Sequence, residues 1–275
     1  MPNWGRAYLH TWARDIGDPM GCEQFSCAPL QWLGPVDPQE ERWLFYLRNP
    51  NGGLLQGDQH QIEIRVGAKT HLEIRSQSAT RLHPGQSTQT LAIRLEPDSS
   101  FIWIPHPLIP GQGADFRQTI RMQMDLGSRL AFADLWTAGR MGMGETWQFQ
   151  HLHNHLEILV GHHLCWTERF HLDPWLQSWI QSPSILGEYP CWGSLYLFGN
   201  WGEVPWTESQ TQWRLQRPQG EILRWVGHHS LDGWQQFYEL AHHLANRTLH
   251  PPQTPLPRSG RKTWAEVHST GREFF

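Results

Sequence analysis

The feature that most constrains the fold of this chain is a period of two in its hydrophobic pattern, repeated in many short segments. Residues 61–66 read QIEIRV, where apolar and polar side chains alternate without interruption. Residues 90–95 and 120–124 repeat the pattern, and residues 101–104 and 130–136 are mostly apolar runs of strand length, with turn-forming residues between them. A period of two is that of a β-strand with one buried face. The pattern therefore predicts a chain built largely from β-strands.

Composition agrees with this prediction. The 275 residues include 25 Gly and 20 Pro, with 39% hydrophobic and only 17% charged residues, a mix that suits short strands joined by turns. One segment has helical spacing instead, since apolar residues recur every three or four positions over residues 231–247. Ser230 is a suitable N-cap for this segment. We predict one helix here, whose apolar stripe packs on a sheet.

These observations predict a mainly β fold. We expect a large single-domain, antiparallel β-rich structure of stacked-sheet or β-helical type over residues 1–250, with one or two C-terminal helices. Residues 61–66 and 72–74 have the pattern of a hairpin, as do residues 120–124 and 130–136. Residues 251–275 are rich in proline and polar residues, and we expect a mobile tail there. The sequence shows no obvious internal repeat.

Several classes of protein are disfavoured by charge and by apolar content. The net charge of −4 and the lack of a long Lys/Arg run disfavour a nucleic-acid partner. The sequence has no apolar run of transmembrane length, so we expect no membrane association. Cys22, Cys27, Cys165 and Cys191 form neither a paired CxxC pattern nor a dense disulfide framework. We therefore expect a soluble cytoplasmic protein with reduced thiols.

Sequence motifs of self-sufficient catalysis are missing. A phosphate-binding GxxxxGK[ST] loop, a GxGxxG turn after a strand, a GxSxG nucleophile elbow and an HExxH helix are all absent. The GRKT run at residues 260–263 lacks the upstream glycine and strand of a phosphate-binding loop. The chain is therefore poor in self-sufficient catalytic equipment.

A glycine-rich hinge, GRMGMGE at residues 139–145, follows an apolar segment that contains Asp134. Three glycines in six residues suggest a tight bend between two strands. The simplest interpretation is a hairpin in which Arg140 and Glu145 form an ion pair across the turn. An acid inside an apolar segment, as Asp134 is, needs either a partner or a function. Asp58, at the end of GGLLQGD, reads locally as a turn residue.

Residues 147–160 carry His151, His153, His155 and Glu157 on one face of a predicted strand. Side chains two apart on a strand point the same way and are about 6.6 Å apart along it, so neighbouring pairs could share a metal ion. Imidazole and carboxylate ligands suit Zn, Cu or Ni. The alternative is the polar face of an ordinary amphipathic strand.

The 17 tryptophans raise a second functional possibility, a Trp-rich β carbohydrate-binding protein or a glycosidase. Catalytic carboxylate pairs of glycosidases are set in space, so the sequence leaves them open. Against this, Trp43, Trp103, Trp136 and Trp166 lie within apolar alternation, which favours a place in the core.

Four motifs occur in order along the chain: GGLLQGD at 52–58, QSATR at 77–81, IPHPLIP at 104–110 and GRMGMGE at 139–145. In this order and spacing they resemble the landmarks of the urease accessory protein UreD family, called UreH in some organisms. LRWVG at 223–227, just before the predicted helix, adds to the resemblance. Each motif alone is weak, but four in register are fairly specific.

The resemblance implies a non-enzymatic scaffold, or metallochaperone, for urease maturation. Family members bind UreF, which recruits the GTPase UreG, and the assembly docks on apo-urease to deliver nickel. An internal tunnel is the proposed path of the ion. Asp58, Asp134 and Glu145 are the expected tunnel-lining groups, and Arg140 would orient Glu145. Nickel(II) would be a transient cargo, and no tightly bound cofactor is expected.

Overall fold

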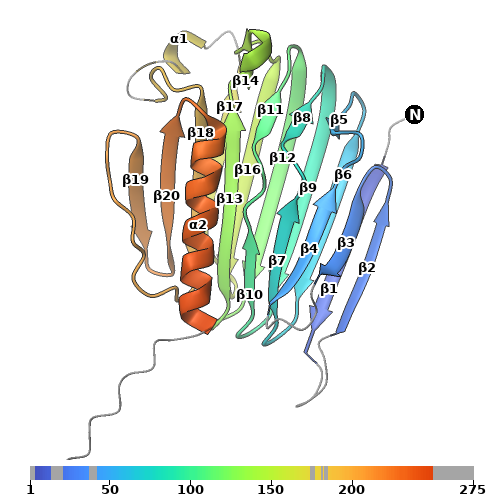
Figure 1. The fold of residues 1–275 in the computed structure, drawn as a ribbon, viewed down its shortest axis with the longest axis vertical. Helices are drawn as coiled ribbons and strands as arrows, with labels where there is room; N and C mark the ends of the chain where they lie inside the picture. Colours follow the sequence, from blue (N-terminus) through green and yellow to red (C-terminus); the bar gives the residue numbers. More distant parts are fainter. Residues whose placement is uncertain are drawn as a thin grey trace, which may run out of the picture.

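The computed structural model describes residues 4–13, 21–36, 42–173, 177–180, 182 and 185–249. Two β-sheets lie face to face, and one long helix covers part of the outer face of one of them (Figure 1). The prediction of a mainly β, stacked-sheet fold with a C-terminal helix is confirmed. The predicted tail, residues 251–275, lies outside the described residues.

The first sheet has seven strands and the second has eight strands along its main path. In spatial order the first consists of β17 (His163–Leu172), β16 (His151–Val160), β12 (Ala114–Met124), β9 (Gly85–Leu95), β6 (Gln59–Val66), β1 (Trp4–Trp12) and β2 (Gly21–Cys27). The second consists of β19 (Gln212–Arg217), β20 (Gly220–Gly227), β18 (Cys191–Phe198), β13 (Arg129–Thr137), β10 (Ser100–Trp103), β7 (His71–Ser76), β4 (Trp43–Arg48) and β3 (Gln31–Val36). Three short strands branch from the second sheet, namely β5 (Gly53–Leu54), β8 (Thr80–Leu82) and β11 (Leu108–Pro110).

The prediction of antiparallel pairing is wrong for the centre of both sheets. There β1, β6, β9, β12 and β16 pair in parallel, and so do β4, β7, β10 and β13. Antiparallel pairs occur toward the edges, such as β1 with β2 and β16 with β17. Parallel pairing requires the chain to leave the sheet and return between neighbouring strands. The second sheet provides that return path.

The two predicted hairpins are therefore turns that carry the chain from one sheet to the other. β6 pairs with β1 and β9, whereas β7, the next strand in sequence, pairs with β4 and β10. Likewise β12 and β13 belong to different sheets. Both strands of each predicted hairpin direct apolar side chains into one shared interior, where Ile64 of β6 and Leu72 of β7 are fully buried. Local alternation cannot distinguish this arrangement from a hairpin, because each strand has one buried face in either case.

The structure reveals a 29-residue repeat that the sequence analysis missed. Gln89 and Gln118, which are neighbours in the first sheet, are 29 residues apart, as are His71 and Ser100 in the second. Each coil consists of one strand in each sheet, so the centre of the molecule is a short solenoid. The repeat is hard to see because equivalent positions conserve burial rather than identity, as with Val66, Leu95 and Met124.

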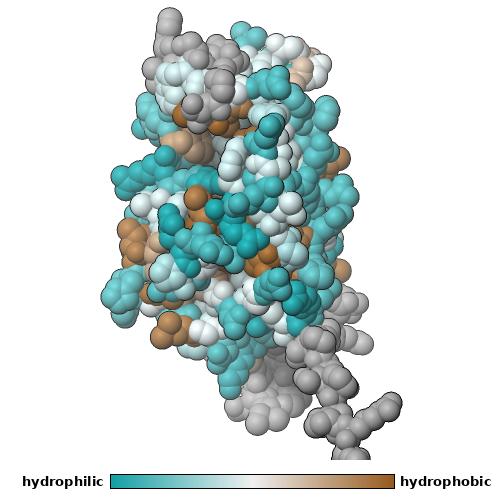
Figure 2. Space-filling view, turned by 90° about the vertical axis from the view of Figure 1, so that its left-hand side faces the viewer, coloured by the Kyte–Doolittle hydropathy of each residue, from teal (hydrophilic) through white to brown (hydrophobic). Residues whose placement is uncertain are grey.

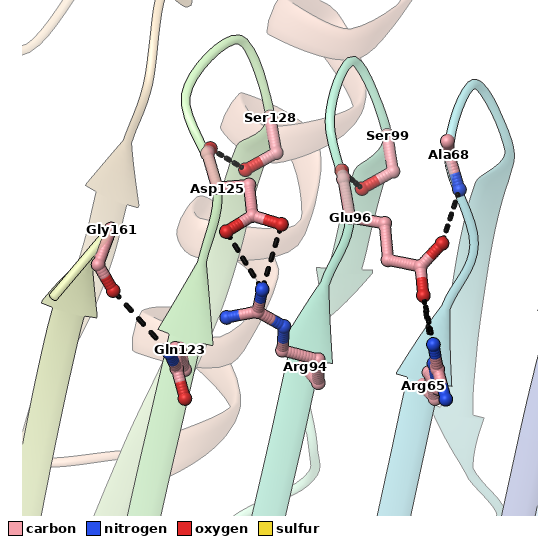
Figure 3. A network of polar contacts seen from close by, with 9 residues as sticks. All are labelled: Arg65, Ala68, Arg94, Glu96, Ser99, Gln123, Asp125, Ser128 and Gly161. Atoms are coloured by element: carbon pink, nitrogen blue, oxygen red, sulfur yellow. Dashed lines mark hydrogen bonds and ion pairs between the residues drawn. The ribbon is translucent and has the colours of Figure 1, made fainter.

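Polar side chains at the turns connect each coil to the next (Figure 3). Arg65 donates to Glu96 at 2.5 Å, and Arg94 donates to Asp125 at 2.7 Å one coil later. Gln123 continues the series with a bond to the carbonyl oxygen of Gly161 at 3.3 Å. The ion pairs are partly exposed, so they specify the register of the coils more than they stabilise the fold.

Two helices and one small hairpin complete the described structure. Helix α1 (Gln177–Ile180) is a single turn, and helix α2 (Ser230–Leu249) confirms the predicted C-terminal helix. The apolar stripe of α2 packs on the second sheet, as predicted; Phe237, Ala241 and Leu244 are fully buried there. The hairpin joins β14 (Gly139–Arg140) to β15 (Glu145–Thr146) through the short helix η1 (Met141–Met143). The edge of the molecule at β19 is mostly hydrophilic, with small isolated hydrophobic areas (Figure 2).

Candidate functional site

A cavity lies between the two sheets, with about 90 Å³ of space for the centres of water molecules. This is room for several waters, because one water needs on the order of 10–15 Å³ on that measure. Three of the four family-like motifs contribute to its wall, including Gly52, Gly53 and the segment from Gln77 to Thr80. Its other polar lining residues are Arg48, Asn49, His60, Ser76, Gln89, His106, Gln118 and Asp134.

A ladder of polar side chains crosses the first sheet beside this cavity. His60, Gln89, Gln118 and Asn154 occupy one register on four adjacent parallel strands. Gln89 Nε2 donates to Gln118 Oε1 at 2.9 Å, and Gln118 Nε2 donates to Asn154 Oδ1 at 3.2 Å. These polar side chains share one level of the inner face, which is otherwise largely apolar. A run of hydrogen bonds therefore extends across the interior.

Asp134 of β13 faces this ladder from the opposite sheet. Its side chain accepts hydrogen bonds from Asn154 Nδ2 at 2.6 Å and from Gln118 Nε2 at 3.4 Å. Burial is the main cause of a raised pKa of Asp134, and the nearby Glu168 carboxylate adds to it; the Trp136 indole and the two amide donors oppose the shift, and the resulting pKa is about 7. Near neutral pH this buried carboxylate therefore exists in both protonated and charged forms.

Further polar side chains lie between Asp134 and the edge of the two-sheet sandwich. Ser194 is the register neighbour of Asp134 on β18, and Arg224 Nη1 donates to Ser194 Oγ at 2.7 Å. Arg224 also donates two hydrogen bonds to Glu168, at 2.6 and 2.7 Å. Tyr196 Oη donates to the same carboxylate at 2.8 Å. Titratable and polar groups thus continue from the cavity lining through Asp134 to the partly exposed Glu168.

The three acids predicted to line a tunnel have different environments. Asp134 lines the cavity, whereas Asp58 and Glu145 are outside its lining. Asp58 is 1% exposed in the turn before β6, where its Oδ2 accepts from the Leu55 amide at 2.9 Å. Its other oxygen is buried and has no hydrogen-bond partner within the described residues.

Glu145 lies in the β14–β15 hairpin, and its ion pair with Arg140 is present as the simplest interpretation predicted. Arg140 Nε donates to Glu145 Oε2 at 2.7 Å and a second guanidinium nitrogen donates to Oε1. The hydrogen bonds from Arg140, and one from the Gln112 amide, hold the pKa of Glu145 below its ordinary value. The ion pair with Arg140 therefore fixes the position of the Glu145 carboxylate in the hairpin.

The histidine-rich strand β16 has the predicted faces. His151, His153, His155 and Glu157 point away from the core, while Leu152, Leu156 and Ile158 are fully buried. The neighbouring β17 adds His171, whose ring stacks on that of His153 with centroids 3.8 Å apart. His155 instead lies 3.2 Å from Glu157. Across the described residues, no group of three or more His, Cys, Asp or Glu side chains is positioned to hold a metal ion.

The four tryptophans assigned to the core from the pattern are placed there or against it. Trp43, Trp103 and Trp136 are buried, and the partly buried Trp166 packs against the core cluster that contains Trp43 and Trp103. Their rings support the packing between the sheets. They do not form an exposed platform of the kind that a carbohydrate ring stacks on.

Sequence reasoning missed most of the interior polar groups. Asn154 was the one polar residue on an otherwise apolar strand face, and that exception was the available signal. Gln89 and Gln118 could have been found from their 29-residue spacing once the repeat was known. Glu168 and Arg224 meet across 56 residues, so no local pattern links them.

Comparison with known proteins decides which family these motifs represent. Residues 12–261 match the family model described as UreD urease accessory protein. The chain belongs to the UreD urease accessory protein family. The resemblance drawn from the four motifs is therefore confirmed, and the family is one of accessory proteins rather than of catalytic enzymes.

Relatives of this UreD-family chain cover most of its length. It is 46% identical over 243 residues to urease accessory protein UreD 2 of Synechococcus sp. (strain JA-3-3Ab), covering 81% of this chain and 89% of the relative. It is 44% identical over 277 residues to UreD of Synechococcus sp. (strain JA-2-3B'a(2-13)), covering 91% and 99%. UreH of Helicobacter pylori (strain HPAG1) is 26% identical over 155 residues, covering 55% and 58%. None of the described helices in this UreD-family member is long and apolar enough to cross a membrane.

Proposed function

We propose that this chain is a urease maturation factor that passes nickel through its interior to apo-urease. In this proposal the chain binds UreF and UreG and docks on the apo-urease subunits, and Ni²⁺ is a transient cargo. The observation that carries the proposal is the position of Asp134, a buried carboxylate on the wall of the cavity between the sheets. Membership in a urease accessory protein family supports the same role.

The interior has the chemistry that a transit route for Ni²⁺ needs. Ni²⁺ binds carboxylate, imidazole and amide oxygen ligands, and a route must hold the ion weakly enough at each point to release it. Asp134, Gln118 and Asn154 provide one carboxylate and two side-chain amides within hydrogen-bonding distance of one another. A cation that approaches Asp134 favours its charged form, so its proton leaves as the ion binds.

In this proposal, different proteins carry out the different steps of urease maturation. The sequence has no phosphate-binding loop of its own, so GTP hydrolysis would be supplied by UreG. All four cysteines are unpaired, including the buried Cys191, which fits a reducing compartment. We therefore place the maturation complex in the cytoplasm.

A complementation experiment tests the proposal. A urease-producing bacterium that lacks its own UreD is supplied with this chain, with the Asp134→Ala variant, or with Glu203→Gln as a control at an exposed carboxylate. We expect the parent and the control to restore urease activity and urease-bound nickel, and Asp134→Ala to lose most of both. Co-purification of tagged chain with UreF, UreG and apo-urease is measured in the same cells.

Two results would contradict the proposal. One is full urease activity in cells that lack this chain altogether. The other is the absence of any complex with UreF or apo-urease while the folded chain is abundant. If Asp134→Ala still restores full activity and still forms the complex, then the role in maturation stands and the interior route through Asp134 is wrong.

A further inference from the structure

The cavity between the sheets opens to solvent at the ends of two neighbouring strands of the second sheet. Gly52 follows β4, and Gln77 and Ser78 follow β7; all three are exposed and belong to the cavity lining. Arg48, the last residue of β4, also lines the cavity and lies beside them, because β4 and β7 are paired up to the preceding residue. We call the opening formed by Arg48, Gly52, Gln77 and Ser78 the mouth of the cavity.

The loops around the mouth are held in place by backbone contacts. Asn49 Nδ2 donates to the Gly53 carbonyl oxygen at 2.6 Å, and the Arg81 amide donates to the Gly52 carbonyl oxygen at 3.4 Å. A Cβ at Gly53 would overlap the carbonyl oxygen of Arg81, so the two segments pack too closely for any side chain there. A mouth that is already formed loses little conformational entropy when a partner binds.

Arg48 gives the mouth an unbalanced positive charge. Its Nε donates to Gln31 Oε1 at 2.9 Å, which orients the guanidinium. Within the described residues, no carboxylate forms an ion pair with Arg48. A guanidinium has five N–H donors in a planar fork that matches the two oxygens of a carboxylate. Arg48 therefore has donors available for an anionic group that arrives from outside.

This charge lies at the entrance to the proposed cation route. Apart from two histidines, Arg48 and Asp134 are the ionisable side chains among the described residues of the cavity wall. A Ni²⁺ ion that approaches Asp134 through the mouth meets the like charge of Arg48 first and is repelled. A carboxylate bound to Arg48 cancels that charge. Carboxylates also bind Ni²⁺, so a protein that carries the ion on acidic residues presents the group that Arg48 recognises.

We infer that the mouth is a docking site for an acidic segment of the protein that supplies Ni²⁺, and that Arg48 recognises a carboxylate of that segment. This inference rests on the proposed function, because it concerns the point where the ion enters the same route. A carboxylate that pairs with Arg48 is no longer available to the ion, so docking and release of the ion are coupled. Complementary charges also speed the encounter between the two proteins.

The test is zero-length cross-linking of the full chain in the complex purified from a urease-producing bacterium. Arg48→Lys keeps the positive charge and supplies an amine, which a carbodiimide joins to a carboxylate in direct contact with it. We expect a cross-link from position 48 to an acidic side chain or the C-terminal carboxylate of UreF or UreG, identified by mass spectrometry of the joined peptides. The control is Arg121→Lys, at an exposed arginine on the first sheet, which should give no cross-link to either protein.

A charge reversal gives a second, independent readout. In a strain that lacks its own UreD, Arg48→Glu should lower urease-bound nickel at least tenfold, whereas Arg121→Glu should leave it unchanged. Replacing the cross-linked acid of the partner by arginine should restore the nickel in the Arg48→Glu strain. An unfolding midpoint close to that of the parent shows that Arg48→Glu is folded; if it is not, the cross-linking of the charge-conserving Arg48→Lys decides.

Several results would overturn the inference. One is an intact complex that gives no cross-link from position 48, and another is a folded Arg48→Glu variant that delivers the full amount of nickel. A cross-link only to a carboxylate of this chain would mean that the chain covers its own mouth. A cross-link only to apo-urease would make the mouth the point where the ion leaves. None of these results affects the proposed function, whose own failure is recognised by full urease activity without this chain.

Discussion

Glu73 of β7 and His242 of α2 meet at 3.0 Å, between Oε1 and Nε2, although 169 residues separate them in the sequence. The same carboxylate is 2.5 Å from Arg75 and 3.4 Å from Arg42. Only 4% of Glu73 is exposed, and it lies on the outer face of the second sheet under the helix. This buried carboxylate therefore adds a polar link between the C-terminal half of α2 and the sheet to the apolar packing of the helix.

Replacing this carboxylate by an amide should loosen the helix. Glu73→Gln leaves two guanidinium groups and one imidazole without their shared anion, so we expect a loss of roughly 3 kcal/mol in the free energy of unfolding. Denaturant unfolding measures the loss, and hydrogen exchange in α2 should rise before exchange in the sheets. The exposed Glu203→Gln serves as the control, with a change below about 0.5 kcal/mol.

The effect of Glu73→Gln should also depend on pH. Burial raises the pKa of Glu73, but the bonds from His242 and Arg75 outweigh burial and hold it below the ordinary value of 4.5. A lowered pKa stabilises the fold above 4.5, and this contribution disappears as the pH falls through the lower folded value. The difference between parent and variant should therefore shrink in acid. A difference that stays constant down to pH 3 would falsify this account of the carboxylate.

Asp134 should impose the opposite pH dependence. Its pKa is raised from 3.8 to about 7 in the folded chain, so between these values the folded state holds a proton that the unfolded state has released. Stability should fall as the pH rises through that window, by at most about 1.4 kcal/mol per pH unit, and level off above it. Asp134→Asn should remove this slope. Parallel stability curves for the two proteins from pH 4 to 7 would count against the raised pKa.

The hairpin that carries Arg140 and Glu145 depends on one glycine. Gly139 has φ +151°, and a Cβ there would overlap the carbonyl oxygen of Glu145 across the hairpin. We expect Gly139→Ala to destabilise the chain by about 2 kcal/mol, measured by thermal or denaturant unfolding. Gly142 is a matched control in the same turn, since a Cβ there meets nothing within 4 Å. Equal stability of the two variants would show that the turn relaxes freely.

The histidine row on β16 can be tested separately from the interior. His151, His153 and His155 share a partly exposed face, and histidines two apart on a strand can chelate a surface-bound ion as a pair. Replacing all three by Ala should let the chain elute from an immobilised Ni²⁺ resin at a lower imidazole concentration. Replacing His162, His228 and His229, which are fully on the surface, should have a smaller effect. The same elution from both triple variants would end the idea of a metal-holding row.

The sequence predicted the strands well and their pairing poorly. Alternation located β6, β12 and β16, an apolar run located β13, and helical spacing located α2, because these signals are local. Whether β6 pairs with β7 or with β9 depends on which sheet each strand joins. The four-residue turn between β6 and β7 is compatible with both pairings. The parallel solenoid follows from contacts 29 residues apart, a distance over which the positions keep only their burial.

The candidate site was predictable in part. An acid in an apolar strand drew attention to Asp134, and the turn glycines drew attention to Arg140 and Glu145. Sequence reasoning could not tell that Asp134 faces a cavity while Glu145 is held by an ion pair at a surface hairpin. That difference arises from the opposite sheet, where Gln118 and Asn154 supply the partners of Asp134.

The 29-residue coil limits how this chain can change its length. Losing one residue inside β9 would turn every following side chain of that strand to the other face, exchanging Leu91 and Ile93 for solvent-facing neighbours. It would also misalign two ion pairs at the turns, Arg65 with Glu96 and Arg94 with Asp125. Gaining or losing a complete coil preserves the register of the strand pairs and of the ion pairs at the turns. Homologues of different length should therefore vary in loops and end strands, or by whole coils, and only rarely by single residues within the central strands.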